Sequence, residues 1–217
     1  ITGYGQTGPK AMAAGHDMSY VGAAGVLSLN SGPVDQPTNP FALLADIGGG
    51  TYPAVMNILL ALRQRDKNGQ GAYLDIAMAE GAFAFAYWAH TKGVVAKENI
   101  ENGGERLTGG RARYRMYPAA DGRQVIVGAI EEKFWAAFCD VIKLPQALRD
   151  DQIDPEATVS EVARLLSAKP ADHWEPLLDA ADCCCSILKT PLEASRDPHF
   201  VARGVFDWKT TVGESQI

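Results

Sequence analysis

The sequence predicts part of a large α/β domain followed by a smaller α+β domain. Two observations predict this fold class. Residues 71–78 alternate apolar and polar side chains as a strand does, and residues 79–96 then carry apolar side chains at helical spacing. Beyond residue 112, extended segments around a short turn precede several amphipathic helical patterns. Strand and helix patterns in this order are typical of packed α/β layers.

The hydrophobic pattern stops between residues 97 and 110, where glycine pairs and polar residues indicate a linker. We therefore expect residues 1–96 in the large domain, 97–112 in the linker, 113–205 in the small domain and 206–217 at the start of a return segment. The chain looks truncated, because residues 1–9 read as the end of a buried strand running into a glycine-rich turn.

The large domain should contain a tightly packed helix that begins near Asp17, with His16 at its entrance. A lone histidine at a helix entrance is more often a hydrogen-bonded structural residue than a catalyst. A carboxylate that orients the imidazole would favour acid–base chemistry instead.

Residues 43–51, Leu-Leu-Ala-Asp-Ile-Gly-Gly-Gly-Thr, place the carboxylate of Asp46 directly before three glycines and an apolar helix pattern over 52–62. Such a helix would point backbone N–H groups and its positive dipole end at a ligand beside Asp46. N–H donors near residues 48–50 are candidates for holding an oxyanion. The competing interpretation is an acidic cap on a buried helix whose glycines allow tight packing, and this stretch alone does not decide between the two.

The small domain should begin with an extended segment at 113–117, turn at Asp121-Gly122 and continue as a strand over 124–130. The elements expected after that strand are a helix from 131, helices near 158–168 and 171–181, a strand through the three consecutive cysteines, and a short helix ending near Gly204.

The composition excludes several classes of function. A formal net charge of −6 over 217 residues offers no electrostatic attraction to nucleic acid or to an anionic membrane surface. No apolar run reaches membrane-spanning length and no signal sequence opens the chain, so a cytoplasmic protein is expected. Three consecutive cysteines, 183–185, together with Cys139 suit neither a disulfide framework nor tetrahedral metal spacing. We expect reduced thiols and no metal site, and a redox role stays open.

Four motifs then occur in order: Gly-His-Asp-x-x-Tyr at 15–20, Leu-Leu-Ala-Asp-x-Gly-Gly-Gly at 43–50, Val-Gly-Ala-Ile-Glu at 127–131, and Asp-Pro-His-Phe-x-Ala-Arg-Gly at 197–204. With these motifs the chain resembles the family III CoA transferases, and within them the α-methylacyl-CoA racemase branch, which carries the His-Asp dipeptide. The resemblance implies the fold of that family, with a Rossmann-like large domain. It also implies a further N-terminal nucleotide-binding region and a C-terminal segment that this chain does not contain.

The resemblance implies a two-base proton transfer at the carbon next to a CoA thioester. His16 matches the family's histidine base, Glu131 the carboxylate that orients it, and Asp46 the acid–base carboxylate on the opposite face. Inversion through a planar enolate needs one group to remove a proton and another to deliver one from the other side.

Substrate contacts are expected from Tyr20, Gly48, Gly49 and Met78. Met78 matches a methionine of racemase-like members, whose methionine-rich surface holds the acyl chain, although a plain core methionine is equally compatible with the sequence. The chain departs from racemase-like sequences at Arg111-Ala112-Arg113, where small or apolar residues are usual, so the acyl group stays open.

The predicted activity is racemisation of 2-methylacyl-CoA thioesters by an interlocked homodimer, with the CoA thioester as substrate and no separate cofactor. The first alternative is a family III CoA transferase in which Asp46 forms an acyl-aspartyl anhydride. The second alternative is a non-catalytic dimerisation or interaction fragment.

Overall fold

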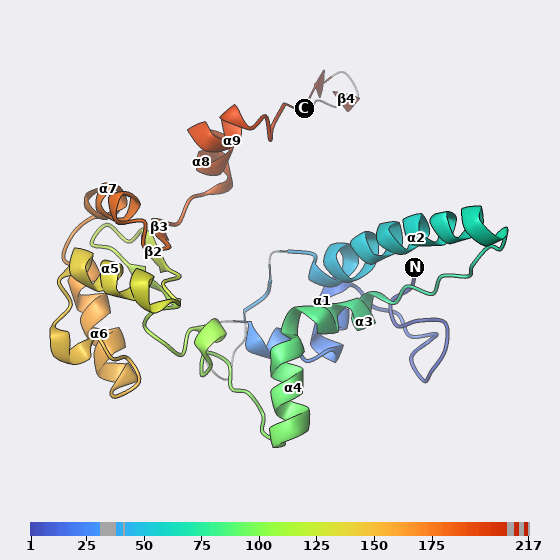
Figure 1. The fold of residues 1–217 in the computed structure, drawn as a ribbon, viewed down its shortest axis with the longest axis horizontal. Coiled ribbons are helices and arrows are strands. Elements are labelled where there is room, and N and C mark those ends of the chain that lie inside the picture. Colours follow the sequence, from blue (N-terminus) through green and yellow to red (C-terminus); the bar gives the residue numbers. More distant parts are fainter. Residues whose placement is uncertain (31–37, 41, 208–210, 213–214, 217) are drawn as a thin grey trace. The chain divides into compact units, whose positions relative to one another are not determined.

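A computed structural model describes residues 1–30, 38–40, 42–207, 211–212 and 215–216. The chain separates into two compact units, Ile1–Arg111 and Ala112–Ile217 (Figure 1). Residues 97–111 therefore group with the first unit. The predicted domain boundaries stay a prediction.

Helices make up most of the first unit. Its elements up to residue 68 are α1 (Asp17–Ala23), a short 3₁₀ turn η1 (Leu27–Leu29), a π-helix η2 (Leu44–Thr51) and α2 (Tyr52–Asn68). The later elements are α3 (Met78–Ala82), the 3₁₀ turn η3 (Phe83–Ala86), α4 (Tyr87–Ala96) and the 3₁₀ turn η4 (Arg106–Thr108). A core cluster of Tyr20, Val21, Ala24, Ala45, Ala79 and Ala82 joins α1, η2 and α3.

The strand predicted over residues 71–78 is wrong for most of its length. Residues 71–76 have no regular secondary structure, and only Ala77 forms a bridge, parallel to Thr2. Two hydrogen bonds make this bridge, Thr2 N–H to the carbonyl of Ile76 and Met78 N–H to the carbonyl of Thr2, both at 2.9 Å. An alternating pattern becomes a strand only where neighbouring strands supply ladder bonds, and among the described residues Thr2 is the one such partner.

The single helix predicted over residues 79–96 is also interrupted. Ala86, the last residue of the 3₁₀ turn η3, lies at φ −127° and ψ 29°, outside the helical region, so α4 starts as a separate helix at Tyr87. Across this break the ring of Phe83 lies against that of His90, with centroids 4.7 Å apart. Apolar spacing alone does not reveal such a change of phase, because both sides of the break still follow a helical period.

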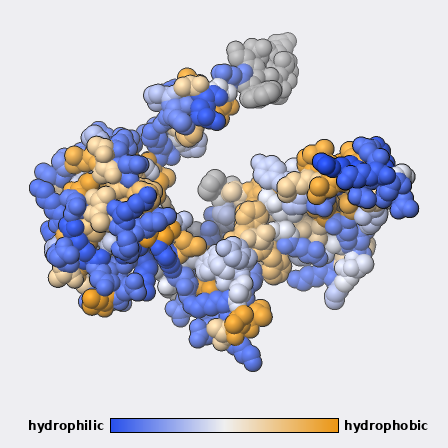
Figure 2. All heavy atoms as spheres, viewed as in Figure 1, coloured by the Kyte–Doolittle hydropathy of each residue, from blue (hydrophilic) through white to orange (hydrophobic). Residues whose placement is uncertain are grey.

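Helix α2 ends as predicted, with Arg65 and Lys67 in its last turn and Gly69 in the left-handed conformation at φ 71°. Large apolar side chains nevertheless remain exposed along it. Leu59 and Leu60 are 61% and 64% exposed, and Val55 and Met56 are exposed to a similar extent. Figure 2 shows this apolar surface next to the hydrophilic C-terminal end of the helix.

The second unit is an α+β layer, as predicted. Its antiparallel sheet has the order β1 (Arg115–Pro118), β2 (Gln124–Val127), β3 (Cys185–Ile187). The hairpin between β1 and β2 turns at Gly122, which has φ 83°. The helices of this layer are α5 (Glu132–Ile142), α6 (Pro155–Leu166) and α7 (Ala171–Ala181), with a 3₁₀ turn η5 (Gln146–Leu148) between α5 and α6.

The core of this unit lies between one face of the sheet and the three helices. Tyr117, Val125 and Val127 point into it, and Trp135 and Phe138 of α5 meet them there. The alternate residues of the strands, such as Met116, face outward. One buried face and one exposed face are usual for an antiparallel sheet.

The last elements are short. They are α8 (Pro191–Ser195), α9 (Pro198–Ala202), β4 (Thr211–Val212) and β5 (Ser215–Gln216), of which the last two pair antiparallel. Within the predicted return segment, 206–217, residues 208–210, 213–214 and 217 lie outside the described residues. Across the described ranges, no helix is both long and apolar enough to cross a bilayer.

Candidate active site

His16 occupies the N-cap position of α1. Its backbone is extended, at φ −128° and ψ 174°, and its carbonyl accepts the N–H of Ser19 at 2.8 Å. The imidazole is exposed. The helix therefore begins at Asp17, as the sequence predicted, and leaves the His16 side chain at the surface of the first unit.

Asp17 is the residue that the sequence analysis missed. It is buried, with only 6% of its surface exposed, and its Oδ1 accepts the backbone N–H groups of Ala45 at 2.7 Å and of Asp46 at 2.8 Å. Those two N–H groups belong to the first turn of η2, where helices lack internal acceptors. The carboxylate of Asp17 thus caps the helix that carries Asp46.

Asp46 is half-buried in that first turn. Its carbonyl accepts the hydroxyl of Thr51 at 3.0 Å. Burial, and then the negative charge of Asp46, raises the pKa of the Tyr20 hydroxyl above its ordinary value. Asp46 and Tyr20 are therefore within electrostatic reach of each other.

The Tyr20 hydroxyl donates to the carbonyl of Gly15 at 2.5 Å, and its ring meets Tyr4 edge-on, with centroids 5.1 Å apart. These contacts hold the Gly15-His16 segment against α1. A direct contact of Tyr20 with substrate stays a prediction.

The expected role of the glycine N–H groups needs correction. The helix begins at Leu44, before the glycines, so residues 48–50 lie inside a π-helix, where each N–H donates to the carbonyl five residues back. The Tyr52 N–H, for example, donates to Ile47. Because these N–H groups are engaged inside the helix, they are not positioned to hold an oxyanion.

The glycines instead permit close packing of η2 on α3. A Cβ at Gly49 would lie 2.5 Å from the carbonyl oxygen of Met78, and one at Gly48 would lie 2.7 Å from the ring of Phe85. Met78 packs against this cluster, with its Cγ 2.7 Å from where a Cβ of Gly50 would stand. The packing interpretation of the glycines and of Met78 is thus supported, and their contact with substrate stays a prediction.

Glu131 belongs to the second unit, where it occupies the N-cap position of α5. Its carbonyl accepts the N–H groups of Phe134 and Trp135 at 3.0 and 2.9 Å. Its carboxylate is exposed and makes no capping hydrogen bond to α5, a helix that the structure describes in full. His16 and Asp46 lie in the other unit, so the pairing of His16 with Glu131 stays a prediction.

The segment of three consecutive cysteines lies beside the loop that precedes Glu131. The Gly128 N–H donates to the carbonyl of Cys184 at 3.0 Å. Burial, and then the charge of Glu131, raises the pKa of the Cys184 thiol. Cys183 and Cys185 are buried and Cys184 is exposed, and all four cysteines are free thiols. The strand predicted through all three cysteines begins only at Cys185, because Cys184 lies in the left-handed region at φ 56°.

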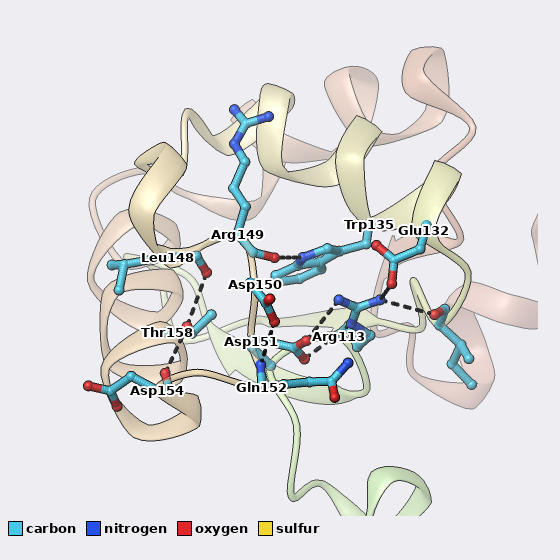
Figure 3. A network of polar contacts seen from close by, with 12 residues as sticks. Arg113, Glu132, Trp135, Leu148, Arg149, Asp150, Asp151, Gln152, Asp154 and Thr158 are labelled. Atoms are coloured by element: carbon cyan, nitrogen blue, oxygen red, sulfur yellow. Dashed lines mark hydrogen bonds and ion pairs between the residues drawn. The ribbon is translucent and has the colours of Figure 1, made fainter.

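A buried ion pair lies beneath the same loop. Arg113 is only 6% exposed and binds Asp151, which is only 2% exposed, through two hydrogen bonds of 3.1 and 2.8 Å. Figure 3 shows the guanidinium between Asp151 and Glu132, with Trp135 beside it. The unusual arginine of the Arg111-Ala112-Arg113 segment at position 113 is therefore engaged inside the second unit rather than presented on its surface.

Comparison with known proteins gives one consistent family. The sequence model of CoA-transferase family III matches residues 1–215. Alpha-methylacyl-CoA racemase of Mus musculus is 31% identical over 210 residues, which cover 95% of this chain and 55% of the mouse protein. Acetyl-CoA:oxalate CoA-transferase of Acetobacter aceti is 26% identical over 94% of this chain and 54% of its own length. The chain thus spans about half the length of these relatives.

The fold is similar to that of a solved structure. A CAIB/BAIF family protein from Brucella suis aligns with a TM-score of 0.74 and 24% identity over 97% of this chain and 56% of its own. That likeness supports the predicted fold, and the family match extends over almost every residue. The chain therefore belongs to CoA-transferase family III.

Proposed function

We propose that the intact protein is a racemase-like enzyme that inverts the 2-methyl stereocentre of branched acyl-CoA thioesters. In this proposal, one acid–base group removes the proton next to the thioester and a second group delivers a proton to the opposite face of the enolate. Asp46 serves one face, and His16, oriented by Glu131, serves the other.

The observation that carries the proposal is the pair of hydrogen bonds that the backbone N–H groups of Ala45 and Asp46 donate to Oδ1 of Asp17. Asp17 directly follows His16 in the chain. The segment that bears the histidine is therefore tied through one buried carboxylate to the first turn that bears Asp46. Two-base chemistry needs its two proton carriers held in a fixed relation, because both must address the same carbon.

In this proposal the backbone of η2 does not stabilise the enolate oxygen. The N–H groups of residues 48–50 lie inside η2, and those of Ala45 and Asp46 bind Asp17. Donors outside this helix must therefore stabilise the developing negative charge.

The second candidate is CoA transfer, the activity that the name of the Acetobacter aceti relative carries. Here Asp46 attacks the thioester carbonyl, the C–S bond breaks, CoA leaves as its thiolate, and an acyl-aspartyl anhydride remains. The half-buried carboxylate of Asp46 supports this role equally well. His16 favours the racemase, because a transferase has no use for a second proton carrier on the opposite face.

The third candidate is a non-catalytic dimerisation or interaction module. The exposed apolar side chains of α2 support an association surface. We infer an interlocked homodimer whether the protein is an enzyme or an interaction module. Light scattering at micromolar concentration tests this inference, and a folded monomer would count against it.

Free thiols suit the reducing cytoplasm, where we expect the protein to act on acyl-CoA without a separate cofactor.

Proton NMR in heavy water tests the main proposal. Deuterium should replace the α-proton of a 2-methylacyl-CoA, and no CoA should pass to an added free acid. CoA transfer without wash-in would select the transferase. A titration that showed no binding of any CoA thioester would select the non-catalytic module.

A further inference from the structure

The buried Arg113 contacts the chain on both sides of Glu131. Its Nη1 donates to the carbonyl oxygen of Ile130 at 3.3 Å and to Oε1 of Glu132 at 2.7 Å. Glu131 lies between these two residues, at the point where the loop after β2 becomes α5. One guanidinium group therefore holds the residue before Glu131 and the residue after it.

The other side of the guanidinium is anchored in the core. Nε and Nη2 bind the two carboxylate oxygens of Asp151, and the group lies over the ring of Trp135 at 5.0 Å from its centroid. In Figure 3 the Asp151 and Glu132 carboxylates approach the guanidinium from different elements. A planar guanidinium with hydrogen-bond acceptors on several of its N–H groups is held in one orientation. It therefore also restricts the positions of those acceptors.

Stability alone does not explain this arrangement. A buried ion pair pays a desolvation penalty that well-packed apolar residues avoid, and replacing such a pair by apolar residues is often neutral or stabilising. The partners that distinguish Arg113 are Ile130 and Glu132. Arg149, in the same unit, also binds a carboxylate and a carbonyl, those of Asp140 and Leu144, but it does not contact residues 130–132.

We propose that Arg113 is a positioning residue that fixes the backbone from which the Glu131 side chain projects, by holding both of its neighbours. The inference rests on the proposed role of Glu131 in orienting His16. The carboxylate of Glu131 makes no capping bond to α5, so the backbone alone sets the direction in which its Cα–Cβ bond leaves the chain. Arg113 fixes that backbone through the Ile130 carbonyl and the first side chain of α5.

Three variants separate positioning from charge and from folding. Arg113→Lys keeps a cation beside Asp151 but loses the fork that reaches Ile130 and Glu132. Glu132→Ala removes one arm at an exposed side chain, 82% of which is in solvent, so it leaves the core intact. The double variant Arg113→Met with Asp151→Leu removes the ion pair without leaving a buried charge unpaired, and it serves if the lysine variant does not fold. Arg149→Lys is the matched control.

Two readouts are measured on the intact protein. In Arg113→Lys, kcat for α-proton exchange should fall roughly 10- to 100-fold, as for a misplaced catalytic group, while KM stays near the wild-type value. Glu132→Ala should show a smaller loss of the same kind. In Arg113→Lys, amide hydrogen exchange should accelerate over residues 128–135 but not over α6. Arg149→Lys should change neither kcat nor this amide exchange.

Each of these measurements can support or overturn the proposed role of Arg113. Wild-type kcat and unchanged local amide exchange in a folded Arg113→Lys or in the double variant would overturn the proposal. Equal acceleration of amide exchange in α6 would also overturn it, because the effect would then be a general loss of stability. If the wild-type protein exchanges no α-protons, the proposed function fails, and the amide exchange of residues 128–135 still tests whether Arg113 holds this segment.

Discussion

Oδ1 of Asp17 accepts the backbone N–H of Asp46 at 2.8 Å, across 29 positions of sequence. The same oxygen accepts the N–H of Ala45, so a buried negative charge stands at the N-terminus of the helix that carries Asp46. A carboxylate at this end of a helix satisfies orphan donors and interacts favourably with the helix dipole. Adjacent residues thus have separate tasks: His16 stays exposed and Asp17 holds Asp46.

Replacing Asp17 should therefore cost both stability and activity. Asp17→Ala leaves the N–H groups of Ala45 and Asp46 without this acceptor, which should lower the free energy of unfolding by about 1–3 kcal/mol. Chemical denaturation measures the loss. Asp66→Ala, which removes a carboxylate that is 72% exposed, should change stability by less than about 0.5 kcal/mol. Equal midpoints for the two variants would exclude the cap.

Gly81 should not tolerate even a methyl group. A Cβ there would lie 2.2 Å from the carbonyl oxygen of Gly49, where α3 meets η2, and backbone cannot move aside cheaply. Gly81→Ala should destabilise the protein by about 1–3 kcal/mol. Gly71→Ala is the control, because its Cβ would meet nothing within 4 Å. Thermal unfolding compares the two, and a neutral Gly81→Ala would mean that the close approach of α3 to η2 is not present.

The buried thiol of Cys139 predicts alkaline destabilisation. Burial raises its pKa from 9.0 to about 12, although the positive charges of Arg149 and Arg113 oppose the rise. Between pH 9 and pH 12 the unfolded chain loses this proton and the folded chain keeps it. The unfolded state then binds fewer protons, so stability falls as pH rises, by at most about 1.4 kcal/mol per pH unit for this group.

Cys139→Ala should flatten that decline more than Cys184→Ala, because the Cys184 thiol is exposed although its pKa is also raised. Denaturation midpoints between pH 8 and pH 10.5 provide the comparison. Parallel declines in the wild type and in Cys139→Ala would show that Cys139 does not cause the loss.

Glu131 should act through His16. Glu131→Gln should slow α-proton exchange, and the double variant with His16→Ala should be little slower than His16→Ala alone, because residues that act as a unit are not additive. Exchange rates for the four proteins give the coupling. Additive losses would make Glu131 an independent group.

The sequence predicted those elements whose pattern depends on nearby residues. Helix α7 spans Ala171–Ala181, as expected, and α1 begins at Asp17. Amphipathic spacing and helix-start signals lie within these segments and need no distant partner. The hairpin around Gly122 was predicted for the same reason, since a glycine that can adopt φ 83° marks the turn locally.

Elements that depend on distant contacts were not predicted. Residues 71–78 alternate like a strand, but a strand exists only where partners pair with it, and Thr2 supplies one bridge. The π-helix over Leu44–Thr51 arises where Asp17 caps its start and where its glycines meet Met78 and Gly81. None of these contacts is visible in residues 43–51 alone.

The motifs nominated candidate site residues, but they carried no information about the geometry around them. The motifs pointed to His16, Asp46 and Glu131, whereas the roles of Asp17 and Arg113 appear only in their hydrogen bonds. Asp17 had a local signal, because an acidic residue in the first turn of a helix can accept hydrogen bonds from backbone N–H groups, including those of distant segments. Arg113 had none, because its partners Ile130, Glu132 and Asp151 follow it by 17 to 38 positions.

We propose that Asp46 and His16 are two proton carriers serving opposite faces of one carbon. Asp46→Ala should remove one carrier, so racemisation in both directions should fall by roughly 10²–10⁴. His16 could still remove and return a proton without inversion. Deuterium wash-in from one enantiomer should therefore outlast racemisation in Asp46→Ala, and wash-in from the other enantiomer should outlast it in His16→Ala.

The most direct measurement follows deuterium wash-in separately from each pure enantiomer of a 2-methylacyl-CoA, by proton NMR, in the wild type and in both variants. The account predicts that each variant keeps wash-in from one enantiomer and that the two variants keep opposite ones. Loss of wash-in from both enantiomers in a folded Asp46→Ala protein that still binds the thioester would contradict it. Asp46 would then be a nucleophile or a structural residue.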